Sequence, residues 1–289
     1  MAADTEATER ETRRPTGGRS LAETATSFAE RLGVKRLLAA YAVLISLYIY
    51  LPMLSLIAFS FNEGGLTFPF VDFSTQWYAE LLASSGIVTA VERSLKLAFV
   101  TMMITTVLAT ATVLAYRRRF PGRRAVLYLL LLGIITPGIT YGVGATLFLN
   151  QLLGFSKGLW LALTVHVVWT LPFAMIVLLA GIPPNLPENE RAARVLGADE
   201  RTVFREITLP QIAPTVLGAA VFAFTLSYNE ATRSLLLVGR QNTMPIQVFS
   251  IASSRRATPE LFALGSITTV FSTLLLLLAG IFVVYRTRS

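Results

Sequence analysis

The sequence contains no cysteine and a single histidine, and it has few charged residues for its length. Without cysteine, the chain can form neither a disulfide nor a thiolate metal site, and it has no cysteine nucleophile. His166 stands alone in an apolar stretch, so we interpret it as a hydrogen-bonded packing residue. No Ser/His/Asp set, metal cluster or G-x-x-x-x-G-K-[ST] phosphate loop stands out. We therefore expect no catalytic, metal or cofactor site, and the chain itself is not an ATPase.

The shortage of charge points to a membrane protein. Charged residues make up 15% of the 289 residues, against about 25% in soluble domains, and 54% are apolar. Six stretches approach or exceed the length of about 20 apolar residues that crosses a bilayer. The predicted spans are residues 37–61, 97–116, 125–148, 159–179, 216–237 and 263–285. We predict an all-α integral membrane protein with a six-helix domain at 36–286, a disordered tail at 1–35 and a short end at 287–289.

The distribution of basic residues predicts the orientation in the membrane. The net charge is +8, but Lys and Arg cluster beside the apolar spans, which is typical of topology determinants and not of a nucleic-acid surface. With the N-terminus inside, 18 of the 25 Lys and Arg residues face the cytoplasm and seven face the other side. We therefore expect both termini, and the polar loop 182–214 between spans four and five, to be cytoplasmic.

The first half of that loop has the features of a short helix. Pro187 suits a first helical turn, and the acidic Glu190 favours the positive end of a helix. Ala192 and Ala193 give a small surface that another protein can approach closely. Gly197 then ends the helix, as a glycine commonly does. The sequence predicts a helix that stops at a glycine corner.

The second half of the loop predicts another short helix. Asp199 is a suitable first residue, and Val203, Phe204 and Ile207 form an apolar face at helical spacing. We expect Leu209-Pro210 to end this helix, because proline interrupts the backbone hydrogen bonds. The loop is thus predicted to be two short helices around a glycine corner.

Polar groups inside the spans are the candidates for a solute path. Glu230 is costly within a bilayer unless it is paired, and Arg233 follows at the spacing of one helical face. Tyr228 and Asn229 add polar groups beside this pair, and Pro137 is expected to kink span three. Two interpretations remain open, a structural ion pair near the interface or side chains that line a path.

The loop also resembles a known family. Ala192-Ala193, Gly197 and Ile207-Thr208-Leu209-Pro210 stand at the spacing of the EAA, Gly and I-x-L-P motifs of permease subunits of binding-protein-dependent (type I) ABC importers. The chain departs from the motif in having Arg191 at the position of its Glu, with Glu190 just before. The resemblance implies a coupling helix that docks in a cleft of an ATP-hydrolysing subunit. The residues it assigns to that role are Glu190, Arg191, Ala192, Ala193, Leu196, Gly197 and Ala198.

The same resemblance implies partners and a location. Importers of this kind combine two permease subunits, two ATP-binding subunits that hold ATP and Mg, and an extracytoplasmic solute-binding protein. The expected location is the bacterial inner membrane, in contact with lipid and without any nucleic-acid partner. A stand-alone channel or secondary carrier is the competing hypothesis, but we find no internal repeat that favours it.

Further residues resemble the second permease subunit of spermidine/putrescine-type systems, which implies a heterodimer. The stretch 224–230, F-T-L-S-Y-N-E, is similar to their F-T-L-S-F-D-E, and Pro137-Gly138-Ile139 is also shared. Asn229 replaces their Asp, and Arg233 adds a positive charge one turn from Glu230. Polyamines are therefore the favoured solute class, with a zwitterionic or anionic solute, such as an amino acid derivative or a phosphonate, as the alternative.

Overall fold

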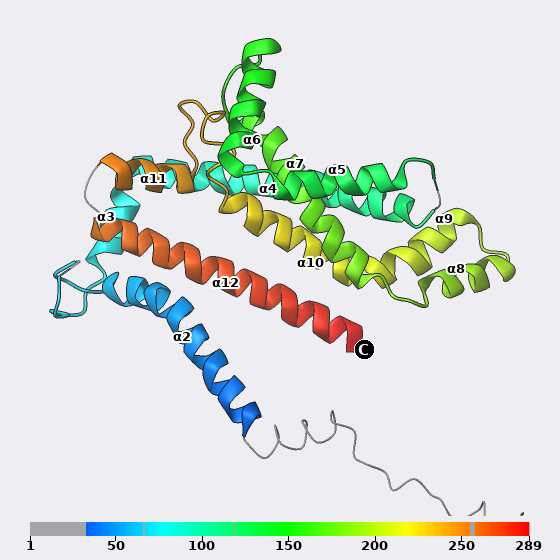
Figure 1. Cartoon of the computed structure of the whole chain (residues 1–289), viewed down its shortest axis with the longest axis horizontal. Helices are drawn as coiled ribbons and strands as arrows, with labels where there is room; N and C mark the ends of the chain where they lie inside the picture. The colour runs from blue at the N-terminus through cyan, green and yellow to red at the C-terminus, as the bar shows by residue number, and fades with distance from the viewer. Residues whose placement is uncertain (1–32, 66, 119, 255–257, 289) are drawn as a thin grey trace, which may run out of the picture. The chain divides into compact units, whose positions relative to one another are not determined.

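The computed structural model describes residues 33–65, 67–118, 120–254 and 258–288, and the helices dominate it (Figure 1). In chain order they are α2 (Val34–Phe59), α3 (Gln76–Ala83), α4 (Ser85–Tyr116), α5 (Arg123–Ile135), α6 (Gly138–Ala145), the π-helical η1 (Thr146–Leu152), α7 (Leu159–Gly181), α8 (Leu186–Val195), α9 (Glu200–Thr202), the π-helical η2 (Val203–Thr208), α10 (Leu209–Tyr228), α11 (Met244–Ser254) and α12 (Pro259–Arg288). The only extended pairing in these ranges is an isolated bridge between Asn62 and Phe73. The all-α prediction is confirmed, while nearly all of the predicted tail lies outside the described residues.

Five helical runs are long and apolar enough to cross a membrane, and a bent helix pair supplies a sixth span if it is counted as one. The five runs are Val34–Phe59, Ser85–Tyr116, Leu159–Gly181, Glu200–Tyr228 and Pro259–Phe282. The second begins well before the predicted start at residue 97. The predicted six spans therefore match these runs, provided that the bent pair is the third.

The chain divides into two compact units, residues 1–55 and 56–289. In the first unit, the described part is the apolar beginning of α2, which has no buried residue. The second unit contains the core, where α4, α7 and α10 pack together. Ala109, Ala174 and Ala219 are fully buried in one apolar cluster, and these small side chains let the three helices approach closely.

A buried polar contact lies within the same core. The hydroxyls of Thr105 in α4 and Thr170 in α7 share a hydrogen bond of 2.8 Å, and Thr170 also donates to the carbonyl of His166. Such pairing removes the penalty of a polar group in an apolar interior. His166 is fully buried and its Nδ1 lies 2.7 Å from the Ser227 hydroxyl, which confirms it as a hydrogen-bonded packing residue.

The third span is broken, which corrects the prediction of one helix at residues 125–148. The chain bends by 109° between Arg123–Ile135 and Gly138–Leu152 (Figure 1). The break is at Thr136, whose ψ of 126° is extended, directly before Pro137. Proline disfavours the helical conformation of the residue before it. The kink expected at Pro137 is confirmed, and it is large enough to separate α5 from α6.

The predicted helix end at Leu209-Pro210 is wrong. A single helical run extends from Glu200 through Pro210 to Tyr228. The six residues before Leu209 form the π-helical η2, in which backbone hydrogen bonds reach one residue further than in an α-helix. Pro210 follows directly after this π-helical stretch, and the helix continues through it to Tyr228.

The predicted fifth span, 216–237, is also too long at its far end. The helix stops at Tyr228, and residues 229–243 form turns. The Asn229 side chain donates to the carbonyl of Thr225 at 3.0 Å, and the Glu230 carboxylate accepts from the backbone N–H of Arg233 at 2.9 Å. Side chains that bond to the backbone in this way compete with the helix, which accounts for its early end.

Candidate functional site

The polar loop between α7 and α10 forms two helical segments around a glycine corner, as predicted. Asn185 precedes α8, and Pro187 lies in its first turn. Gly197 follows α8 with a φ of +90°, in the left-handed region that favours glycine. The Asp199 carboxylate then accepts a hydrogen bond of 3.0 Å from the backbone N–H of Thr202 and caps the next helix. These local interactions make the corner a defined structure.

The tip of this corner presents apolar side chains outward. Val195 and Leu196 are 87% and 88% exposed, although both are large and apolar. Ala192 and Arg191 are also exposed, and Ala193 and Ala198 are half-buried. The end of α8 therefore carries two adjacent exposed apolar side chains on an otherwise polar loop.

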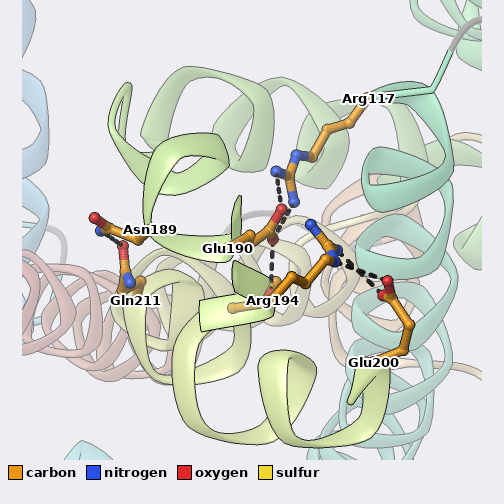
Figure 2. A network of polar contacts seen from close by, with 7 residues as sticks. Arg117, Asn189, Glu190, Arg194, Glu200 and Gln211 are labelled. Carbon is orange, nitrogen blue, oxygen red and sulfur yellow. Dashed lines mark hydrogen bonds and ion pairs between the residues drawn. The ribbon is translucent and has the colours of Figure 1, made fainter. Parts of the chain in front are cut away.

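Glu190 turns inward instead, toward two other segments of the chain (Figure 2). Its carboxylate accepts two hydrogen bonds of 2.8 Å from the guanidinium of Arg117, at the end of α4, and one of 2.7 Å from the Thr208 hydroxyl in η2. The hydrogen bonds from Arg117 hold the pKa of Glu190 below its ordinary value, so the carboxylate is ionised at neutral pH. Two residues could correspond to the glutamate of the EAA motif. Arg191 is exposed, whereas Glu190 is hydrogen-bonded to other segments of the same chain.

Two more side-chain pairs brace the corner (Figure 2). Arg194 near the end of α8 makes a bidentate ion pair with Glu200 of α9, at 2.7 and 3.1 Å. Asn189 donates to the amide oxygen of Gln211 in α10 at 3.0 Å. Both pairs link α8 to the helical run that follows Gly197, and the Arg194–Glu200 pair is exposed to solvent.

The second candidate region is the turn after α10, where the predicted Glu230–Arg233 pair forms. Arg233 Nη1 lies 2.8 Å from Glu230 Oε2, with only 10% and 6% of the two side chains exposed. The pair lies in a turn beyond the helix, which corrects the expectation of one helical face. Glu230 also accepts a hydrogen bond of 2.9 Å from the Thr232 hydroxyl, so residues of the same turn hold its carboxylate from two sides.

Arg233 connects this turn to two spans that the sequence did not link to it. Its guanidinium carbon lies 3.3 Å from the centroid of the Trp169 ring in α7, a cation–π contact. Its other terminal nitrogen lies 3.5 Å from the carbonyl of Thr136, at the break of the third span. Neither Trp169 nor Thr136 is predicted as a functional residue, because no sequence spacing relates them to residue 233.

The other path candidates lie around this turn in different environments. Tyr228 is buried, and its ring contacts those of Phe224 and Phe271. Asn229 is exposed and its amide lies 3.5 Å from the Ser272 hydroxyl of α12. Pro137 is exposed at the break of the third span. The structure thus brings Pro137, Glu230 and Arg233 into one region, while Tyr228 belongs to the packed interior.

Comparison with known proteins identifies the class. Residues 83–288 match the family described as "Binding-protein-dependent transport system inner membrane component", and the chain belongs to this family. It is therefore a multi-pass permease subunit in the inner membrane, part of an ABC importer that works with a solute-binding protein. It is not an enzyme, and ATP hydrolysis takes place in separate subunits of such systems.

Individual relatives are consistent with this membership. The chain is 30% identical over 242 residues to the spermidine/putrescine transport system permease protein PotC of Haemophilus influenzae, covering 83% of this chain and 93% of the relative. It is 30% identical over 231 residues to the putrescine transport system permease protein PotI of Escherichia coli K12, covering 76% and 81%. Among solved structures, a bacterial ABC transporter that imports the acidic polysaccharide alginate matches 90% of this chain and 98% of its own, with a TM-score of 0.61 and 17% identity. At that identity the structural match shows the fold alone.

Proposed function

We propose that this chain is one of two homologous permease subunits of an ATP-driven importer for a small charged organic solute, with polyamines of the spermidine/putrescine class favoured. The observation that carries this proposal is the similarity, over most of both chains, to permeases named for spermidine and putrescine. The complete importer would contain two ATP-binding subunits, which hold ATP and Mg, and an extracytoplasmic solute-binding protein. The second permease would be a relative of this chain, as the polyamine-type resemblance implies.

The corner after α8 is proposed to be the docking element for the ATP-binding subunit, with the loop 182–214 and both termini in the cytoplasm. The exposed Val195 and Leu196 support this, because such a tip fits an apolar cleft in a partner. The proposed contact residues are Arg191, Ala192, Ala193, Leu196, Gly197 and Ala198. Glu190 would hold α8 in position through its hydrogen bonds to Arg117. Closure of the ATP-binding subunits would then carry α8 with them as a rigid element.

The turn after α10 is proposed to border the solute path through Asn229, Glu230, Arg233 and Pro137. The structure favours one specific alternative to a polyamine. Glu230 is neutralised by the buried Arg233 and bonded to Thr232, so it offers little net negative charge to an ammonium group. A zwitterionic or anionic solute therefore remains the second candidate, and a polyamine would rely on carboxylates of the other permease and of the binding protein.

Uptake by the complete transporter distinguishes the two solute classes. Wild-type transporter, reconstituted with its binding protein, is tested with labelled spermidine, a neutral amino acid derivative and a phosphonate. We expect spermidine uptake, and we expect Asn229→Asp to increase it by adding a carboxylate at the exposed position. Arg233→Ala, which removes the positive charge beside Glu230, is compared in the same assay, with the amount of folded protein measured for each variant. If neither variant changes the uptake of any charge class, the assignment of this turn to the path is wrong.

A further inference from the structure

The carboxylate of Glu190 joins three segments that are far apart in the sequence. Arg117 stands at the end of α4, Glu190 in α8 and Thr208 in η2, and we call these three residues the Glu190 clasp (Figure 2). The guanidinium binds the carboxylate through two parallel hydrogen bonds of 2.8 Å, a geometry that fixes orientation as well as distance. The clasp is therefore a direct mechanical link between α8 and the end of α4.

The clasp differs from the other ion pair of the corner in its burial. The side chains of Arg117 and Glu190 are 23% and 11% exposed, whereas those of Arg194 and Glu200 are 40% and 72% exposed. Exposed pairs contribute little because water and salt screen them, and partly buried bidentate pairs hold their geometry more firmly. Of the two described ion pairs on α8, the one to Arg117 is therefore the stronger link and the one to Glu200 the weaker.

The position of the clasp determines which spans move with α8. Chain connectivity alone attaches α8 to α7 on one side and, through Gly197, to the run that becomes α10 on the other. The α4 helix is not adjacent to α8 in the chain, because α5, α6, η1 and α7 lie between them. Its end is held to α8 by the hydrogen bonds of Arg117. The three helices α4, α7 and α10 form the packed core, so a link to all three turns a displacement of α8 into a movement of the whole core.

We propose that Arg117 is a positioning residue for energy coupling, which locks α8 to α4 through Glu190 so that docking movements reach the core without being absorbed by the loop. This inference rests on the proposed docking of α8. Beside the clasp is a pocket of about 450 Å³, lined among others by Arg118, Phe204 and Leu114. Space next to α8 would let the helix tilt toward α4 once the clasp is broken, and that tilt would dissipate the applied displacement.

The test uses the complete transporter in proteoliposomes, with solute uptake and ATP hydrolysis measured on the same samples. We expect Arg117→Ala to lower uptake about fivefold or more, within the usual range of coupling between sites. ATP hydrolysis should continue, so that more ATP is used per solute. The charge exchange Arg117→Glu with Glu190→Arg should recover part of the lost uptake, because it restores the ion pair in reverse. Glu200→Gln, which removes the charge of the exposed pair, is the matched control. It should leave the number of ATP molecules hydrolysed per transported solute unchanged.

Co-purification of the ATP-binding subunit separates this inference from the proposed function. If wild-type chain does not retain that subunit, the docking proposal itself fails. If wild type retains it but Arg117→Ala does not, the clasp serves docking and the coupling role is refuted. If Arg117→Ala keeps the normal ratio of ATP to solute, or if the charge exchange recovers nothing while Glu200→Gln is equally impaired, the inference is overturned. The inference is supported if Arg117→Ala retains the ATP-binding subunit but uses more ATP per transported solute, and if the charge exchange recovers part of the lost uptake.

Discussion

Substitutions of Gly197 test whether the corner after α8 is a docking surface. Its φ of +90° lies in the left-handed region, where a side chain clashes with the following carbonyl. A Cβ built at this position meets no heavy atom within 4 Å. The cost within the chain is therefore backbone strain alone, about 1–2 kcal/mol. We expect Gly197→Ala and Gly197→Phe to lower the free energy of unfolding by similar amounts, because neither side chain meets a neighbour.

The same two variants should differ strongly in transport. A partner that covers the corner leaves no room for an aromatic ring, so Gly197→Phe should abolish uptake and separate ATP hydrolysis from solute movement. Gly197→Ala, with a single methyl group, should retain part of the uptake. Denaturant unfolding in detergent gives the stability, and proteoliposome assays of uptake and phosphate release give the coupling.

Gly122 offers a matched control for this experiment. It precedes α5 with a φ of +85°, and a Cβ there also meets nothing within 4 Å. Gly122→Phe therefore carries the same backbone strain at a position outside the proposed docking surface. Uptake by Gly122→Phe should stay close to that of wild type. Equal uptake by Gly122→Phe and Gly197→Phe would refute the assignment of the corner as a docking surface.

Three further predictions follow from the contacts described above. Glu230→Gln leaves Arg233 buried without a counter-ion and should lower the free energy of unfolding by about 3–5 kcal/mol, while Glu230→Gln combined with Arg233→Met should recover most of that loss in the same denaturant assay. Gly142→Ala places a Cβ 2.6 Å from the backbone oxygen of Arg233 and should lower stability by about 1–3 kcal/mol, measured as a lower thermal midpoint. Because the hydrogen bonds from Arg117 lower the pKa of folded Glu190, its stabilisation is complete above the pKa of an unfolded glutamate and is lost as pH falls through the lowered folded value. Wild type should therefore lose stability more steeply in acid than Glu190→Gln, and parallel curves would contradict the clasp.

Local chemistry made the corner predictable. Pro187, Gly197 and Asp199 each act on the backbone within a few residues, and each does in the structure what its type favours. The partner of Glu190 was not predictable in this way. Arg117 lies 73 residues earlier, and only the packing of α4 against the other core helices brings it to α8. Periodicity and caps contain no information about such a pairing.

The two prolines predicted to interrupt helices behave differently, and this difference also depends on surroundings that the local sequence does not encode. At Pro137 the preceding Thr136 becomes extended, and its carbonyl faces the buried Arg233. Pro210 follows the π-helical η2, and there the helix continues. Proline is equally unfavourable in both places, so the surroundings decide the outcome. The end of span five also depends on such contacts. The apolar sequence continues to residue 237, but the helix ends at Tyr228, where side chains form hydrogen bonds with the backbone of the following turn.

The uninterrupted passage through Pro210 connects the two candidate regions. The run Glu200–Tyr228 contains 29 residues, about 43 Å at the rise of an α-helix. It begins directly after the glycine corner and ends directly before the turn of Glu230 and Arg233, whose contacts reach α7 and the break of the third span. If a partner displaces the corner, as proposed, this helical run is the direct connection through which the displacement reaches the turn. A break at Pro210 would have separated the two regions, whereas the helical run passes through Pro210 and joins them.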